Sequence, residues 1–107
     1  MYLSRYIKSN LQKQILDLIF SFLSPNDTTI ILFGSQTEKN KSKYSDIDIG
    51  VISNERIKDE TFLTLIEKLN YEVDTLRRID LVEFSRVGDE FQKEALKNAE
   101  IWHTAKN

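Results

Sequence analysis

A chain of 107 residues with 40% hydrophobic residues, 30% charged residues and a net charge of −2 has the size and composition of one globular domain, residues 1–107. A net charge of −2 gives no general attraction for nucleic acid, whose non-specific binding depends on Lys and Arg contacts to phosphate. The chain has no cysteine, no secretory leader pattern and no apolar stretch near the roughly 20 residues that cross a bilayer, so we expect a cytoplasmic protein without disulfides or membrane contact.

The first predicted element is an amphipathic helix over roughly 9–23. Its apolar residues recur at spacings of three and four: Leu11, Ile15, Leu18, Ile19, Phe22 and Leu23. Ser9 and Gln12 have the form of a capping box that would start this helix, and Met1–Lys8 either extends it or packs as an extended arm. The single proline, Pro25, predicts a turn after it.

Three strands and two helices are expected beyond that turn. Thr28–Phe33 and Ile47–Ile52 are short runs rich in β-branched residues, which predicts strands. Apolar spacing predicts a second helix within 54–70, a third strand at Arg78–Phe84, and a final helix after Gly88. This order predicts an α/β (α+β) fold, with a small mixed sheet of at least three strands covered by helices.

Two carboxylates begin the second predicted strand. Because side chains alternate between the faces of a strand, Asp46 and Asp48 should emerge on the same side. Like charges this close raise each other's pKa unless a cation joins them. Asp80, an acid among apolar neighbours in the third strand, is the third candidate. Singly, Asp46 could cap a turn and Asp48 could face solvent, but three carboxylates on two strands favour a site for Mg²⁺ or Mn²⁺, which prefer oxygen ligands.

Gly34 and Ser35 follow the first predicted strand directly. A glycine lets the backbone approach a phosphate closely, and the hydroxyl and amide groups after it can donate hydrogen bonds to that phosphate. Alone, such a dipeptide is more often only a turn. Beside metal-binding carboxylates it predicts a site for a nucleoside triphosphate, because phosphoryl-type transfer requires chiefly positioning and charge stabilisation.

The spacing of these residues resembles that of a known family. Gly34 and Ser35, then ten residues, then Asp46 and Asp48, with Asp80 in "RIDLVEF", are similar to the minimal nucleotidyltransferase (MNT) group of the DNA polymerase beta superfamily. The resemblance covers most of the chain and implies the nucleotidyltransferase fold. It also implies that the three aspartates are the metal-binding catalytic acids, and that Gly34 and Ser35 bind the triphosphate of ATP.

Members of this size resemble antitoxins encoded beside a HEPN-type ribonuclease. The resemblance implies a metal-dependent enzyme that transfers AMP from ATP to a hydroxyl, expected to be a tyrosine, of an all-helical HEPN toxin, with which it forms a hetero-oligomer. One alternative is a binding subunit that neutralises the partner by complex formation. Another is a nucleotidyltransferase that modifies a small hydroxylated molecule such as an aminoglycoside.

The loop after Gly34 and Ser35 departs from the family pattern, because it lacks both the arginine that usually follows Gly-Ser and a loop glycine shortly after it. Where the family usually has an arginine after Gly-Ser, this chain has Gln36. Lys39, Lys41 and Lys43 could supply charge from farther along the loop, but a lysine does not reproduce the bidentate fork of an arginine. This departure is the sequence feature that favours the binding-subunit alternative.

Overall fold

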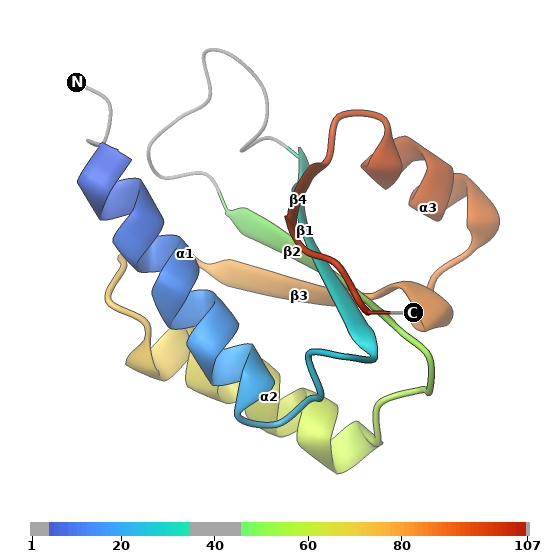
Figure 1. Ribbon diagram of the computed structural model, residues 1–107, viewed down its shortest axis with the longest axis horizontal. Coiled ribbons are helices and arrows are strands. Elements are labelled where there is room, and N and C mark those ends of the chain that lie inside the picture. The colour runs from blue at the N-terminus through green and yellow to red at the C-terminus, as the bar shows by residue number, and fades with distance from the viewer. Residues whose placement is uncertain (1–4, 35–45, 107) are drawn as a thin grey trace.

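The computed structural model describes residues 5–34 and 46–106 as a four-stranded sheet with helices on both faces (Figure 1). The sheet order is β3-β2-β1-β4, with β2 and β3 parallel and β1 antiparallel to both of its neighbours. This confirms the predicted α/β class. In chain order the elements are α1 (Arg5–Phe20), β1 (Thr28–Phe33), β2 (Ile47–Ser53), α2 (Asp59–Glu72), β3 (Ile79–Glu83), the 3₁₀ helix η2 (Phe84–Arg86), α3 (Asp89–Leu96) and β4 (Glu100–His103).

The helix bounds differ from the predicted ones more than the strand bounds do. α1 begins at Arg5, so Ser9 lies inside the helix. The predicted start at Ser9 and the extended-arm alternative are wrong for residues 5–8, and the alternative in which this segment extends the helix is confirmed for them. A serine is tolerated in a helix interior, and nothing in the sequence between Arg5 and Ser9 stops a helix. α2 begins at Asp59, because Ile57 donates its backbone N–H to the buried side chain of Glu83, 2.8 Å away, and does not join the helix.

The larger part of the core lies between one face of the sheet and the two long helices. Figure 1 shows α1 and α2 covering this face together. Ile15 and Ile19 of α1 and Leu65 and Leu69 of α2 are completely buried there. They pack on inward-facing strand residues: Ile30, Leu32, Ile47, Ile49, Val51, Ile79 and Leu81. This layer holds β2 and β3 in register, because both strands bury alternate side chains in it.

The second face of the sheet has a smaller core. Ile31, Phe33 and Phe84 are buried there, with Ala95 and Ala99 from α3 and the segment after it packed against them. Gly50 is required on this face, since a Cβ at that position would lie 2.7 Å from Cγ1 of Ile31. Because side chains alternate along a strand, the even-numbered residues of β2 point toward this face.

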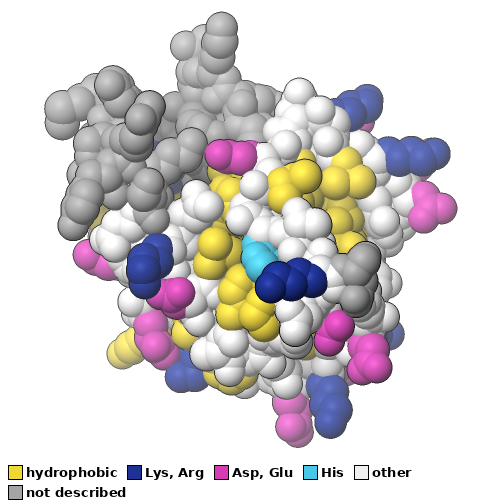
Figure 2. Space-filling model, in the orientation of Figure 1, with side chains coloured by type: hydrophobic (Ala, Val, Ile, Leu, Met, Phe, Trp, Pro, Cys, Tyr) yellow, Lys and Arg dark blue, Asp and Glu magenta, His cyan; other side chains and the backbone are white. Residues whose placement is uncertain are grey.

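β4 was not predicted from the sequence. It pairs with β1 and forms one edge of the sheet. The Nε2 atom of His103 lies 2.8 Å from the carbonyl oxygen of Pro25. The ring of His103 packs edge-on against the ring of Phe20 at a centroid distance of 4.6 Å. Figure 2 shows hydrophobic side chains around this histidine, with acidic and basic side chains interspersed on the rest of that face. A strand of four residues with two exposed is too short for its pattern to be recognised.

Among residues 5–34 and 46–106, no helix has the length and apolar character needed to span a bilayer.

Candidate active site

Asp48 and Asp80 are brought side by side by the parallel pairing of β2 and β3. They are direct register partners, and both are half-buried. Asp48 alternates with Ile47 and Ile49, which are buried under α1 and α2, so its carboxylate lies on the opposite face of the sheet. Asp46 precedes β2 by one residue and is exposed. Asp46 is thus an exposed acid just before β2, and Asp48 is a half-buried acid within it, while their same-side arrangement stays a prediction.

The electrostatic environment of Asp48 reflects this crowding. The pKa of Asp48 is raised from 3.8 to about 6, chiefly by burial and additionally by the nearby charges of Asp80 and Asp46. Desolvation and like charge both disfavour the ionised carboxylate. A cation or a hydrogen-bond donor bound here would relieve both effects. Asp48 therefore gains electrostatically from a bound cation.

Gly34 lies directly against the Asp48 carboxylate. It follows Phe33, whose register partner in β1–β2 pairing is Asp48, and it adopts φ +74. A Cβ built on Gly34 would collide with Oδ2 of Asp48 and lie 3.2 Å from its Cγ. A side chain is thus excluded both by the backbone conformation and by the carboxylate. From the sequence, Gly34 was expected to let the backbone approach a phosphate closely. In the structure, the absence of a side chain at Gly34 also leaves space for the carboxylate of Asp48.

Ser35, the other residue predicted to bind phosphate, lies outside the described residues, as do Gln36, Lys39, Lys41 and Lys43. Their proposed roles stay predictions. The described part of the site consists of Gly34 at the end of β1 and the aspartates of β2 and β3.

The donor set suits a hard divalent cation, because carboxylate oxygens are the ligands that Mg²⁺ and Mn²⁺ prefer. Within the described ranges, however, no three His, Cys, Asp or Glu side chains converge closely enough to hold a metal ion by themselves. An ion held by these carboxylates would therefore need further ligands to complete its coordination. The oxygens of a triphosphate are such ligands.

Two polar residues near these strands were not found by sequence reasoning. Asn70, in the last turn of α2, hydrogen-bonds through its side chain to the backbone of Ile79, the residue before Asp80. Glu83, 1% exposed at the end of β3, accepts hydrogen bonds from the Ile57 N–H and from Arg86 Nε. A polar residue in a helical turn or at a strand end carries no local sequence signal for such tertiary contacts. The glutamate in "LVEF" could have been recognised as buried only together with its partner Arg86, three residues later.

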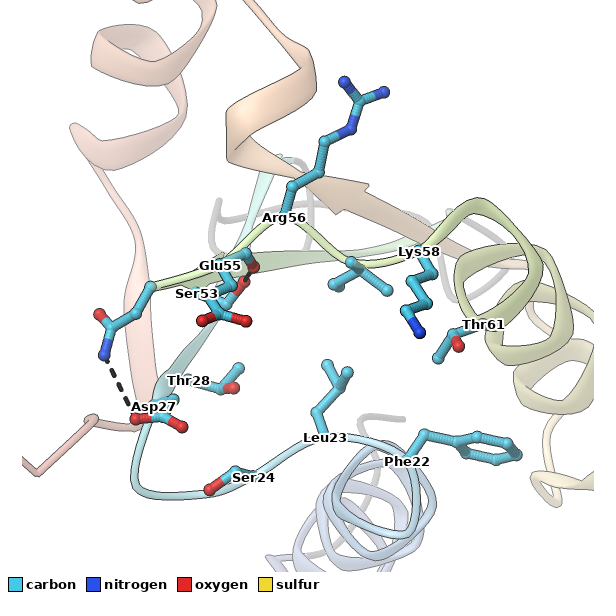
Figure 3. Close-up of a pocket in the computed structure, with 12 residues that line it drawn as sticks. Phe22, Leu23, Ser24, Asp27, Thr28, Ser53, Glu55, Arg56, Lys58 and Thr61 are labelled. Carbon is cyan, nitrogen blue, oxygen red and sulfur yellow. Dashed lines mark hydrogen bonds between the residues drawn. The ribbon is translucent and has the colours of Figure 1, made fainter.

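The hollow in Figure 3 lies elsewhere. It has a volume of about 420 Å³ and is lined by the turn after α1, the start of β1 and the segment before α2, including Asp27, Thr28 and Ser53. Figure 3 shows Lys58 pointing toward this hollow and Arg56 pointing away from it. Since Thr28 pairs with Ser53 at one end of the β1–β2 ladder and Phe33 pairs with Asp48 at the other, the hollow is at the opposite end of the sheet from the aspartates.

Residues 7–106 match the family model described as polymerase beta, nucleotidyltransferase. Among curated proteins, none matches the chain.

Several solved structures share the fold, among them two toxin–antitoxin structures. One chain in a structure of the tri-AMPylated Shewanella oneidensis HEPN toxin in complex with MNT antitoxin is 23% identical, with a TM-score of 0.68 and coverage of 88% of this chain and 71% of that chain. One chain in a toxin–antitoxin structure with AMP-PNP is 24% identical, with a TM-score of 0.72 and coverage of 87% and 73%. At these identities the likeness concerns the fold.

Proposed function

The chain belongs to the polymerase beta nucleotidyltransferase family, which confirms the resemblance seen in its sequence, and from this we propose that it transfers AMP from ATP to a tyrosine hydroxyl of a cognate HEPN-type toxin. It acts as the antitoxin of that partner, in the cytoplasm, as part of a hetero-oligomer. The fold supports this proposal, since chains of the same fold occur in a complex with a tri-AMPylated HEPN toxin and in a toxin–antitoxin structure with AMP-PNP.

The observation that carries the proposal is the position of Asp48. Its carboxylate lies beside Asp80 across parallel strands and against the Cα of Gly34, and its pKa is raised to about 6. Strongly perturbed acids with identified charged neighbours are typical of functional sites. A solvated surface aspartate has no need of a glycine that leaves space for it.

In the proposed site, Asp46, Asp48 and Asp80 would hold Mg²⁺ or Mn²⁺, which would supply charge neutralisation for the triphosphate. Gly34 lets the chain lie close to the phosphates, and Ser35 donates to them. Asp80 accepts a hydrogen bond from the acceptor hydroxyl and orients its oxygen toward the α-phosphorus. The hydroxyl oxygen then bonds to that phosphorus, the bond to the β-phosphate oxygen breaks, and pyrophosphate leaves. The hydroxyl proton passes to Asp80 and then to solvent.

The second reactant must come from the partner. A domain of this size can position a triphosphate but has little further surface with which to orient an acceptor, so docking of the toxin supplies the orientation. Docking also excludes water and strengthens the electrostatic interactions of the carboxylates. The hollow lined by Asp27, Thr28 and Ser53 does not adjoin Asp48, so it does not favour a small-molecule acceptor.

A second candidate is favoured by Gln36. If the glutamine in place of the family arginine removes the grip on phosphate, the chain is an inhibitory binding subunit that retains an ancestral site.

Intact mass spectrometry of the partner separates the two candidates. The HEPN-type protein encoded beside this chain is incubated with the chain, ATP and Mg²⁺, and we expect the mass of one or more added AMP groups. Asp48→Asn and Asp46→Asn should abolish the addition. Asp17→Asn is the matched control, because Asp17 forms an exposed ion pair with Lys13 on α1, which covers the other face of the sheet. An unmodified toxin that is still bound and silenced would contradict transfer and establish the binding subunit.

A further inference from the structure

The outer edge of β3 is bound by a side chain in place of a strand. β3 is the last strand of the sheet on its side, so its alternate backbone groups face outward without a neighbouring strand. At Ile79, Oδ1 of Asn70 accepts from the backbone N–H at 2.8 Å, and Nδ2 donates to the carbonyl oxygen at 2.8 Å. The amide of Asn70 thus makes the paired bonds that a peptide group of a fifth strand would make.

Asn70 is itself fixed to its helix. Its Nδ2 also donates to the carbonyl oxygen of Ile66, one turn earlier in α2, at 2.9 Å. Leu69, the residue before it, is completely buried in the core. The amide therefore transmits the position of a packed helix to the edge of the sheet, although Asn70 is an exposed residue.

The two peptide units that Asn70 binds are the ones that lead to the acids. The carbonyl of Ile79 belongs to the planar peptide unit that joins Ile79 to Asp80. The N–H of Ile79 belongs to the unit whose other end, the carbonyl of Arg78, accepts from the N–H of Ile47 at 2.8 Å. That N–H in turn belongs to the peptide unit that joins Asp46 to Ile47.

From this sequence of contacts we propose that Asn70 is a positioning residue for the active site, an inference that rests on the proposed function. It orients Asp80 through one peptide plane and Asp46 through two, while touching neither carboxylate. A helix residue thereby sets the separation of acids on two different strands. Since misplacement of reacting groups by about 1 Å can reduce turnover by about 100-fold, small movements of β3 would matter for transfer.

The first test measures positioning without any ligand. In the free chain, amide hydrogen exchange is compared at Ile47, which bonds to Arg78, and at Val51, a buried reference in the same strand. In Asn70→Ala, exchange at Ile47 should accelerate by about tenfold relative to Val51, because the acceptor peptide loses its outer support. An unchanged ratio would overturn the inference.

Gln92→Ala is the matched control. The Nε2 of Gln92 donates to the carbonyls of Phe84 and Val87 at 2.8 and 3.1 Å, so it too holds backbone through a side-chain amide, but beyond the other end of β3. It should leave the ratio of Ile47 to Val51 exchange unchanged. If Asn70→Ala folds poorly, the isosteric Asn70→Asp replaces the donor with an oxygen facing two carbonyls. It should accelerate exchange at Ile47 in the same direction.

The second test measures chemistry. Asn70→Ala should lower kcat for AMP transfer by about tenfold or more while KM for ATP stays within about twofold. The substitution disturbs the positions of the aspartates but removes no group that binds ATP. Gln92→Ala should leave both within about twofold. An equal loss of kcat in the two variants would overturn the positioning role. If the wild type transfers nothing, the proposed function fails, and the inference is decided by exchange at Ile47 alone.

Discussion

The Cα of Gly34 faces the carboxylate of Asp48 across the β1–β2 pair, at a point where any side chain would meet Oδ2 of the acid. The contact joins a left-handed backbone conformation to an acid whose pKa is raised to about 6. A substitution at Gly34 therefore displaces Asp48 as well as straining the chain.

We expect Gly34→Ala to destabilise the fold by about 1–3 kcal/mol, because a non-glycine residue at φ +74 is strained before the clash with Asp48 is added. Urea unfolding measures this loss. Gly88→Ala is the control, because a Cβ there meets nothing within 4 Å and φ is −75. It should change stability by no more than about 1 kcal/mol. Equal losses in the two variants would show that the Gly34–Asp48 contact is unimportant.

Asp48→Asn should stabilise the free protein at neutral pH. The folded pKa of Asp48, about 6, is above its ordinary 3.8, so the folded state binds the proton more tightly than the unfolded state. The folded protein therefore loses stability as pH rises from about 4 to about 6, and asparagine, which has no charge, removes this loss. Unfolding free energies are measured at pH 4, 5, 6 and 7. The stability of the variant relative to the wild type should increase up to about pH 6 and stay constant above it. A variant that is less stable than the wild type at pH 7 would make Asp48 structural.

Metal binding should depend on nucleotide. The described acids do not enclose a metal ion, so we expect weak Mg²⁺ or Mn²⁺ binding by the chain alone and much tighter binding with a non-hydrolysable ATP analogue, whose oxygens complete the shell. Titration calorimetry with and without the analogue measures the difference. The double variant Asp46→Asn/Asp48→Asn should lose the nucleotide-dependent part, while Asp17→Asn retains it. Equal binding by the wild type and the double variant would remove the proposed metal site.

Gln36→Arg should increase nucleotide affinity or transfer rate, since a well-aligned charge-assisted contact to phosphate contributes about 1.5–3 kcal/mol. Gln36→Lys should gain less, because an ammonium lacks the bidentate fork. Binding of the ATP analogue and single-turnover transfer measure the two effects. No gain in either variant would indicate that lysines of the same loop or the partner already supply the charge.

Arg86→Met should destabilise the fold by about 3 kcal/mol, because it leaves the carboxylate of Glu83, 1% exposed, without its cation. Arg86 also binds the carbonyl of Ile57 at 2.8 Å and lies 4.5 Å over the ring of Phe62, so one side chain joins β3 to the start of α2. Lys97→Met, which breaks the exposed pair with Glu94, should change stability by less than about 1 kcal/mol. Thermal and urea unfolding of both variants decide between the two magnitudes.

The bounds of the strands that carry the site could be predicted closely, because the short apolar runs in the sequence coincide with the strand positions that are buried. Thr28–Phe33 was predicted with the bounds that the structure has, and the strand with Asp80 within one residue at each end. The start of α2 could not be predicted, because Ile57 fits the helical spacing but bonds to Glu83, a residue 26 positions away. β4 and the contacts of Asn70 depend likewise on tertiary pairing, which local periodicity does not encode.

The position of β4 bears on how the chain folds as it is synthesised. The central strand β1 receives one neighbour from β2, but its other edge is completed by β4, and Ala105 beyond it bonds to Thr29, 76 residues away in sequence. Until residues 100–105 have emerged from the ribosome, the edge of Ile30–Leu32 is an open template for pairing with another strand. Closing it is a long-range step, which is slow compared with helix formation. A nascent chain is therefore exposed to proteolysis and misassociation until its final strand is in place.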